Sequence, residues 1–419
     1  MKVLVLNSGS SSVKYKVYEY GQTPEPIAKG IIERIGLTGP GINCSCRLTH
    51  WESCSCHEVL ENPERLKVKN HSDAINTICQ ILMSDKCGLL KDIAEIEGIG
   101  HRVVHGGEEF TGSTIIDDAV LDGIRKCAKL APLHNPPAIL GIEACAEFFR
   151  NTPQVAVFDT AFHHTIPRNA YMYGLPMDYY KEHRIRRYGF HGTSHRYVSR
   201  KAIELLDKPA EETRVITCHL GNGCSITAVK GGKAVDTSMG LTPLEGLIMG
   251  TRSGDLDPAI PLFLIRELGM GAAEVDELLN KASGLKGICG KADVRDIERL
   301  AAEGDEKCAL ALNMFSYRVA RYIGGYTMVM NGVDAIVFTG GIGEHGAAMR
   351  ARILQNAGYL GLRIDAGKNE RSETDISAAD SRVRVFVIPT DEESVIASDT
   401  GRLVEESRSS NSKKAALVK

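Results

Sequence analysis

The sequence predicts an α/β protein that contains a duplicated domain. Strand-like and helix-like runs alternate along the chain, which is typical of the α/β class. Two stretches, Val3–Val17 and Val215–Val229, each consist of a strand, a polar turn with glycine and a second strand. This repetition favours two related domains, although two hairpins can also resemble each other by chance.

Hydrophobic periodicity places the individual elements. Predicted strands are Lys2–Leu6, Val13–Tyr18, Gln154–Phe158, Arg214–Leu220, Ser225–Val229, Asp334–Thr339 and Arg382–Ile388. Predicted helices are Ser72–Leu82, Glu306–Met330 and Ala347–Asn356. Because Glu306–Met330 is mostly apolar, we expect a central buried helix there. The polar tail from Glu405 onward is expected to fray.

Composition and charge exclude several classes of protein. The 419 residues are 43% hydrophobic and 25% charged, as in ordinary globular proteins. A net charge of −3 argues against a nucleic-acid partner. No apolar run approaches the roughly 18 residues of a membrane span, and Val3–Leu6 is too short for the apolar core of a signal peptide. We therefore expect a cytoplasmic protein without a membrane partner, with its 12 cysteines reduced.

Two polar turns have the composition of phosphate-binding loops. Asn7–Ser12 offers glycine, Ser10 and Ser12, and Gly221–Gly223 offers two glycines around an asparagine. Lys14 follows the first turn on the same strand face as Ser12. The sequence contains no Walker A pattern, which argues against a P-loop enzyme.

Gly341–Gly346 matches the G-x-G-x-x-G pattern of dinucleotide-binding domains. It follows a predicted strand, and Asp365 lies where an acid that binds ribose would be expected. Too few residues remain after it for a complete dinucleotide-binding domain, so a nicotinamide enzyme is the weaker interpretation. The milder expectation is that this segment binds part of a nucleotide.

Two arginines and a histidine lie between glycines. Arg102 lies in Gly100–Gly107, Arg252 in Met249–Asp255 and His191 in Gly189–His195. Each arginine taken alone is compatible with a surface ion pair. Together they form a suitable set to stabilise charge on a phosphoryl group during transfer.

Carboxylates follow two of the predicted strands. Asp159 ends one of them, where ligands bind in α/β folds, and Glu392 and Glu393 follow another. Such carboxylates suit Mg²⁺, although the two glutamates also fit the N-terminus of a helix. His191 and His195 have the spacing of zinc ligands on a helix, but the accompanying glutamate is absent.

Four cysteines cluster around His50, at positions 44, 46, 54 and 56. A hairpin centred there would pair Cys44 with Cys56 and Cys46 with Cys54 on one face. The C-x-C spacing is shorter than that of usual zinc sites, so packed thiols are favoured over a metal centre.

The joint pattern resembles the acetokinase family, whose superfamily includes sugar kinases, actin and heat-shock chaperone ATPases. The segments that carry the resemblance run in order from Asn7–Lys14 to Thr390–Glu393; between them lie Gly100–Gly107, Gly189–His195, His219–Gly223, Met249–Pro258 and Thr339–Glu344. The resemblance implies two duplicated ribonuclease H-like domains, each a mixed sheet flanked by helices, with the active site in the interdomain cleft. It places residues 1–160 and 394–419 in one lobe and 161–393 in the nucleotide-binding lobe.

The resemblance also implies an activity and a set of site residues. The activity is reversible, ATP- and Mg²⁺-dependent phosphorylation of acetate by direct in-line transfer, with Mn²⁺ as the alternative metal, in a homodimer. The implied catalytic residues are Arg102, Asp159, His191 and Arg252, and the substrate-binding residues are Arg102, Val104, His134 and Phe190. The implied metal-binding residues are Asn7 and Glu392. The implied ATP-binding residues are Ser10, Ser12, Lys14, His219, Leu220, Gly221, Asn222, Gly223, Gly341, Ile342, Gly343 and Glu344.

Some positions depart from the family's pattern or leave alternatives open. His345 stands where the family usually has Asn, which leaves the nucleotide preference open, and Gly287–Arg295 departs from the usual serine-containing loop. Val104 resembles acetate-preferring members, so a kinase for propionate or another short acid is the alternative within the family. A nucleotide-dependent clamp or filament protein of the same superfamily would need neither arginine.

Overall fold

The computed structural model describes residues 1–22, 25–36, 41–48, 52–55, 68–84, 89–132 and 134–417. The chain folds into two units. Unit 1 comprises Met1–Ala161 and Asp391–Lys419, and unit 2 comprises Phe162–Thr390. Glu392 and its two neighbours therefore lie in the same unit as Arg102 and Asp159.

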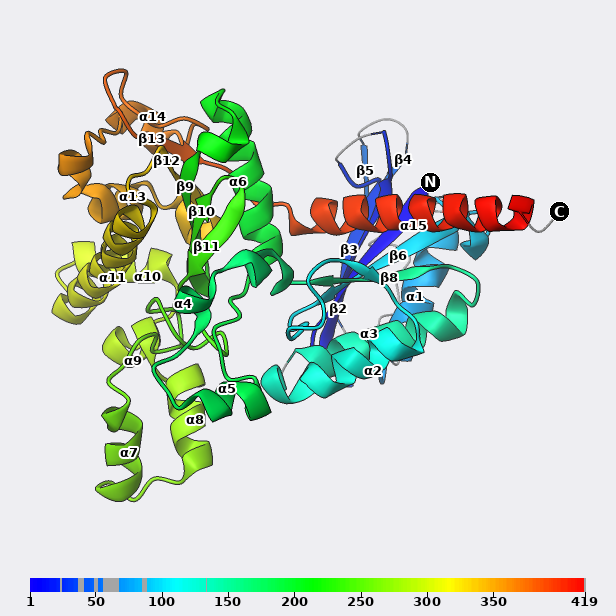
Figure 1. Ribbon diagram of the computed structural model, residues 1–419, viewed down its shortest axis with the longest axis horizontal. Coiled ribbons are helices and arrows are strands. Elements are labelled where there is room, and N and C mark those ends of the chain that lie inside the picture. The colour runs from blue at the N-terminus through cyan, green and yellow to red at the C-terminus, as the bar shows by residue number, and fades with distance from the viewer. Residues whose placement is uncertain are drawn as a thin grey trace. The chain divides into compact units, whose positions relative to one another are not determined.

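Unit 1 is built on a mixed sheet with the strand order β5-β4-β3-β2-β1-β6-β8-β7. Its strands are β1 (Lys2–Ser8), β2 (Ser12–Glu19), β3 (Ala28–Glu33), β4 (Gly41–Leu48), β5 (Glu52–Ser55), β6 (Ile96–Val103), β7 (Thr114–Ile115) and β8 (Gln154–Phe158). β1 pairs antiparallel with β2 and parallel with β6, and β6 pairs parallel with β8 (Figure 1). The carboxyl ends of β1, β6 and β8 therefore share one edge of the sheet.

Unit 2 has a sheet with the strand order β11-β10-β9-β12-β13. Its strands are β9 (Arg214–Leu220), β10 (Cys224–Lys230), β11 (Lys233–Thr237), β12 (Ala335–Thr339) and β13 (Arg384–Val387). β9 pairs antiparallel with β10 and parallel with β12, and β12 pairs parallel with β13. This order and these directions repeat those of β3-β2-β1-β6-β8 in unit 1. The predicted duplicated α/β fold is confirmed.

Helices flank both sheets. Those of unit 1 are α1 (His71–Met83), α2 (Asp118–Cys127), α3 (Asn135–Phe148) and α15 (Glu392–Leu417). Those of unit 2 are α4 (Arg168–Tyr171), α5 (Met177–His183), α6 (Gly192–Leu206), α7 (Ala259–Arg266), α8 (Ala272–Lys281), α9 (Gly284–Cys289), α10 (Val294–Ala302), α11 (Glu306–Met330), α12 (Gly340–His345), α13 (Ala347–Leu354) and α14 (Ala366–Glu370). α15 packs against β1, β6 and β8, whereas α6 packs against β9 and β12. Within the described chain, no helix has the length and apolar character of a membrane span.

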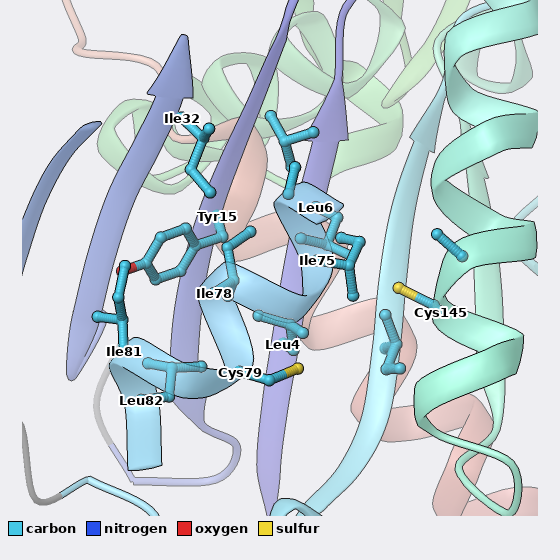
Figure 2. Packing of buried hydrophobic residues seen from close by; sticks show 14 of the residues in the cluster. Leu4, Leu6, Tyr15, Ile32, Ile75, Ile78, Cys79, Ile81, Leu82 and Cys145 are labelled. Carbon is cyan, nitrogen blue, oxygen red and sulfur yellow. The ribbon is translucent and has the colours of Figure 1, made fainter. Parts of the chain in front are cut away.

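The core of unit 1 shows how the sequence pattern positions a helix. Ile75, Ile78 and Leu82 of α1 are fully buried, as their spacing predicts. They face Leu4, Leu6, Tyr15 and Ile32 from the first three strands (Figure 2). The side chain of Asn70 accepts a hydrogen bond from the backbone N–H of Asp73 at 2.8 Å, which fixes where the helix begins.

The expectation that Glu306–Met330 is a central buried helix is wrong. α11 has the predicted bounds, but Leu310, Tyr317 and Met328 are 53%, 67% and 82% exposed. The helix covers β9 and β10 with one face and contacts α9, α10 and α13. A largely apolar sequence did not reveal that one side stays uncovered.

The expectation of a frayed tail is also wrong. Residues from Glu405 onward continue α15 as far as Leu417. Val404 is fully buried, and Arg408 donates a hydrogen bond to Glu97 at 2.7 Å. These tertiary contacts favour a helix that composition alone does not predict.

The cysteine-rich hairpin has the predicted backbone register. β4 and β5 pair antiparallel with Cys46 opposite Cys54. Cys56 lies outside the described residues, so the pairing of Cys44 with Cys56 stays a prediction. No group of three or more His, Cys, Asp and Glu residues in the described chain is placed to hold a metal ion.

Candidate active site

Arg102 and Asp159 meet where two parallel strands of unit 1 end. Arg102 is the penultimate residue of β6, and Asp159 directly follows β8. Arg102 Nε and Nη2 lie 3.2 Å and 2.7 Å from the two carboxylate oxygens of Asp159, which is 1% exposed. Burial opposes the charge of Arg102, but Asp159 and Glu392 outweigh it and hold its pKa above the ordinary value.

Glu392 adds a second carboxylate beside this pair. Its Oε2 lies 3.7 Å from Arg102 Nε at the beginning of α15. Burial raises the pKa of Glu392 to about 7, with Asp159 and Glu393 acting in the same direction and Arg102 against them. Lys16 Nζ lies 3.1 Å from Glu393 and 3.6 Å from Asp391. This part of the site therefore holds more carboxylates than cations.

The first predicted phosphate turn is shorter than expected. β1 continues through Ser8, and Asn7 pairs with Lys14 across the hairpin, so only Gly9–Ser11 form the turn. The N–H of Gly9 donates to the carbonyl of Ser12 at 2.7 Å, and His71 Nε2 lies 2.9 Å from the carbonyl of Gly9. Asn7, Ser10, Ser12 and Lys14 thus lie on one hairpin.

The second predicted phosphate turn lies beside two of the predicted catalytic residues in unit 2. Gly221–Gly223 joins β9 to β10, as the sequence predicts. A Cβ atom placed on Gly223 would lie 3.4 Å from the His191 ring and 3.6 Å from Arg252 Nη1. The ring of His219 stacks on His191 at a centroid distance of 4.4 Å. Because glycine has no side chain, the backbone here can approach both Arg252 and the His191 ring closely.

A chain of hydrogen bonds fixes the ring of His191. Its Nδ1 lies 2.9 Å from Ser225 Oγ, which lies 2.7 Å from His195 Nε2. Burial lowers the pKa of His195 well below its ordinary value, and His163 and His219 act in the same direction, which favours the neutral ring. His191 itself has a left-handed backbone with φ +56° at the beginning of α6. Because Nδ1 is held by Ser225, the Nε2 and Cε1 side of the ring is the side next to Gly223.

The loop that carries Arg252 is anchored at both ends. The N–H of Gly246 donates to Asp255 Oδ1 at 2.8 Å, and Tyr322 donates to Asp255 Oδ2 at 2.9 Å. Inside the loop, the N–H of Gly250 donates to the carbonyl of Asn222 at 3.2 Å. Gly254 has φ +68°, and a Cβ there would lie 2.3 Å from the carbonyl of Leu247. Only glycine fits this turn.

Arg252 differs from Arg102 in its electrostatic surroundings. Among the described residues, no carboxylate forms an ion pair with Arg252. Burial lowers its pKa, with Cys224 opposing this shift. A half-buried guanidinium without an anionic partner is a favourable position for an anionic ligand.

The predicted nucleotide segment is helical. Gly340–His345 form α12 directly after β12, and Glu344 Oε1 accepts hydrogen bonds from the N–H groups of Gly340 and Thr390 at 2.8 Å and 3.2 Å. Gly341 is exposed and Ile342 is half-buried. The three remaining candidates fall into two groups: Val104 and His134 are half-buried in unit 1, whereas Phe190 of unit 2 is 1% exposed.

Comparison with known proteins gives the family. The model of the Acetokinase family matches residues 2–398. This chain belongs to the acetokinase family. An acetate kinase of Carboxydothermus hydrogenoformans is 52% identical over 412 residues, covering 96% of this chain and 99% of that protein.

Solved structures agree with this assignment. A Porphyromonas gingivalis acetate kinase is similar with a TM-score of 0.88 and 44% identity, covering 96% of this chain and 99% of that one. A Francisella tularensis propionate kinase is similar with a TM-score of 0.85 and 43% identity over the same shares of both chains. The two-domain α/β fold of this acetokinase family member is therefore that of solved carboxylate kinases.

Sequence reasoning missed the residues that hold the site in place. Ser225 and His195 orient the ring of His191. Lys16 balances part of the negative charge of the carboxylates at the beginning of α15. Asp255 anchors the loop that carries Arg252. The sequence pattern indicates His195 only as a possible zinc ligand. The regular spacing of Lys14 and Lys16 on one strand face was the one available signal for Lys16.

Proposed function

We propose that this protein transfers the terminal phosphoryl group of ATP reversibly to acetate, which yields acetyl phosphate and ADP. The observation that carries the proposal is the guanidinium of Arg252, which has no carboxylate partner among the described residues and lies with His191 beside Gly223. Membership of the acetokinase family supports the same reaction.

The chemistry needs positioning and positive charge rather than a base. Acetate is already an anionic nucleophile at neutral pH, so no side chain has to remove a proton. In-line transfer spreads negative charge over the phosphoryl oxygens, which cationic donors stabilise. We assign this role to Arg252 and His191 of unit 2 together with Arg102 of unit 1, and we assign Asp159 the orientation of Arg102.

The remaining residues of the proposed site bind the substrates. We assign acetate to Val104, His134 and Phe190 beside Arg102. We assign ATP to the two hairpins and α12, through Ser10, Ser12, Lys14, His219–Gly223 and Gly341–Glu344. Backbone N–H groups and hydroxyls in these turns are suitable phosphate donors.

We assign Mg²⁺, with Mn²⁺ as the alternative, to Glu392 and Asn7. The donor set fits, because Mg²⁺ takes one or two carboxylates and fills its other positions with water and phosphate oxygens. The excess of carboxylates around Glu392 also favours a divalent cation. Bound Mg²⁺ would neutralise charge on the nucleotide phosphates.

Propionate is the second candidate substrate. The similarity to the Francisella tularensis propionate kinase favours it, and Val104 is the side chain whose size would discriminate. One methylene group contributes about 1–3 kcal/mol, or roughly 10–200-fold, to the preference. Comparing kcat/KM for acetate and propionate in wild-type protein and in Val104→Ala tests this assignment, because the variant should shift the ratio toward propionate.

A second copy of the chain is the proposed partner. α7 is an apolar helix with no buried residue, and Ile260, Leu262 and Phe263 are 41%, 47% and 56% exposed. An exposed apolar face of this kind is typical of an interface, and the family resemblance implies a homodimer. Phe263→Glu should convert a dimer to a monomer in light scattering; a wild-type monomer would contradict this proposal.

We also propose that the protein acts in the cytoplasm, because the reaction needs ATP and acetate.

The experiment that tests the function is ADP release measured with and without acetate, in the presence of ATP and Mg²⁺. The proposal predicts release that saturates with acetate and is reversed by acetyl phosphate. Slow ATP hydrolysis that does not respond to any short carboxylate would contradict it and favour a nucleotide-dependent clamp.

A further inference from the structure

Arg350 is a buried arginine whose N–H groups are all occupied. It lies on α13, just after α12, and is 0% exposed. Nε donates to Asn369 Oδ1 at 2.8 Å, and Nη1 donates to the carbonyls of Gly343 and Glu344 at 2.8 Å and 2.9 Å. Nη2 donates to the carbonyl of Asn369 at 2.6 Å and to Ser372 Oγ at 3.0 Å. These bonds use the full donor capacity of a guanidinium.

The acceptors around Arg350 are neutral. They are three backbone carbonyls, one side-chain amide and one hydroxyl. Glu370 acts on the guanidinium only through a Coulombic interaction, which opposes the lowering of the Arg350 pKa by burial. Burying a charge without an opposite charge in direct contact is costly and is tolerated where hydrogen bonds satisfy it completely. The site is therefore built specifically for a guanidinium, and a lysine ammonium has too few donors to replace it.

Arg350 binds the carboxyl-terminal turn of α12, the helix that we assign to nucleotide binding. The carbonyls of Gly343 and Glu344 belong to the last turn of α12, where helix carbonyls lack partners within the helix. A cation there also interacts favourably with the helix dipole. The side chain of Glu344 holds the other end of the same helix through the N–H of Gly340. Together the two contacts fix α12, while Gly341 remains exposed on its outer side.

We propose that Arg350 is a positioning residue that sets the affinity for nucleotide by fixing Gly341–Glu344, without touching the nucleotide itself. This inference rests on the proposed function, because it requires α12 to bind ATP. It predicts a selective effect: loss of Arg350 weakens ATP binding and leaves acetate binding nearly unchanged. A purely structural role would instead lower the amount of folded protein and leave both KM values unchanged.

The test compares Arg350→Lys and Arg350→Met with the matched control Arg352→Met. Arg352 lies on the same helix and donates to Asn313 at 2.5 Å, away from the α12 carbonyls. Steady-state kinetics give KM for ATP and for acetate, calorimetric titration with Mg-ATP gives Kd, and circular dichroism gives the thermal midpoint. Because charged hydrogen bonds are lost, we expect KM and Kd for ATP to rise about tenfold or more in the Arg350 variants. KM for acetate should stay within about twofold of the wild-type value. Arg350→Lys should lie between wild-type and Arg350→Met.

Two further measurements keep the outcome unambiguous. If the Arg350 variants do not fold, Asn369→Ala takes their place. It removes the acceptor of Arg350 Nε and leaves the guanidinium present. The same selective rise in KM for ATP is expected. Folded variants with an unchanged KM for ATP would overturn the inference. If wild-type protein shows no acetate-dependent ADP release but binds Mg-ATP in an Arg350-dependent way, the proposed function fails and the positioning role stands.

Discussion

Arg102 and Asp159 form a two-point ion pair, with Nε 3.2 Å and Nη2 2.7 Å from the carboxylate oxygens. The pair joins the ends of β6 and β8 and locks the orientation of the guanidinium. It also shares the charge of Arg102 with a buried carboxylate. The two candidate catalytic arginines are therefore different: Arg102 is oriented by a partner, whereas Arg252 keeps its charge available.

Arg252→Ala should lower kcat by roughly 10²–10⁵-fold, the range measured for oxyanion donors and arginine fingers. The thermal midpoint should change little, because Arg252 makes no ion pair with another described residue. Arg299→Ala is the matched control, since Arg299 pairs with Glu303 on the surface of α10. A kcat within threefold of wild-type would remove Arg252 from the mechanism.

Asp159→Asn should lower kcat by roughly 10²–10³-fold, because the amide cannot orient Arg102 through two charged contacts. Arg102→Ala alone should lower kcat by roughly 10²–10⁵-fold. If Asp159 acts through Arg102, the double variant should be no slower than Arg102→Ala. Additive losses in the steady-state kcat would show that Asp159 has a separate role.

Glu392→Gln should raise the Mg²⁺ concentration needed for half-maximal activity, since the amide is a weaker ligand for a hard cation. A rise of about tenfold is expected from the loss of one carboxylate ligand. Glu406→Gln on the same helix is the control, because Glu406 is exposed and pairs with Arg402. Identical Mg²⁺ titrations for wild-type and Glu392→Gln would clear Glu392 of the metal role.

His101 should make unit 1 sensitive to acid. Burial lowers its pKa to about 4, and its Nε2 lies 2.7 Å from the side-chain amide of Gln154. Between the ordinary value near 6.5 and pH 4, the unfolded chain binds more protons at this residue than the folded protein. The contribution of neutral His101 to the free energy of unfolding is therefore fully present above pH 6.5. It is lost as the pH is lowered through this window, by about 3 kcal/mol in total.

His101→Gln should flatten this part of the stability profile, measured by urea unfolding at several pH values. His183→Gln is the control, since His183 is exposed on α5. An equal slope in wild-type and His101→Gln between pH 6.5 and 4 would show that His101 does not carry the effect.

The sequence predicts elements whose signal is local. β8, β9 and α11 have the predicted bounds, and glycine turns correctly indicate the hairpin at Gly221–Gly223. The exposed face of α11 and the helical end of α15 were predicted wrongly, because both depend on which neighbours cover an element.

The candidate site divides in the same way. Arg252 and His191 can be proposed from the sequence because each lies in a glycine-rich motif, and the structure places both beside Gly223. Ser225 and Arg350 cannot, because each acts through a partner that only the fold brings close. The residues next to them in the sequence do not predict these contacts.

The central claim is that the terminal phosphoryl group of ATP passes to the oxygen of a short carboxylate. Hydroxylamine traps an acyl phosphate as a coloured hydroxamate, so incubation with ATP, Mg²⁺ and a panel of short acids measures that bond directly. The account predicts acetohydroxamate in amounts equal to the ADP released, with acetate the best substrate and the Arg252→Ala variant nearly inactive. ADP release without any hydroxamate from any acid of the panel would contradict it.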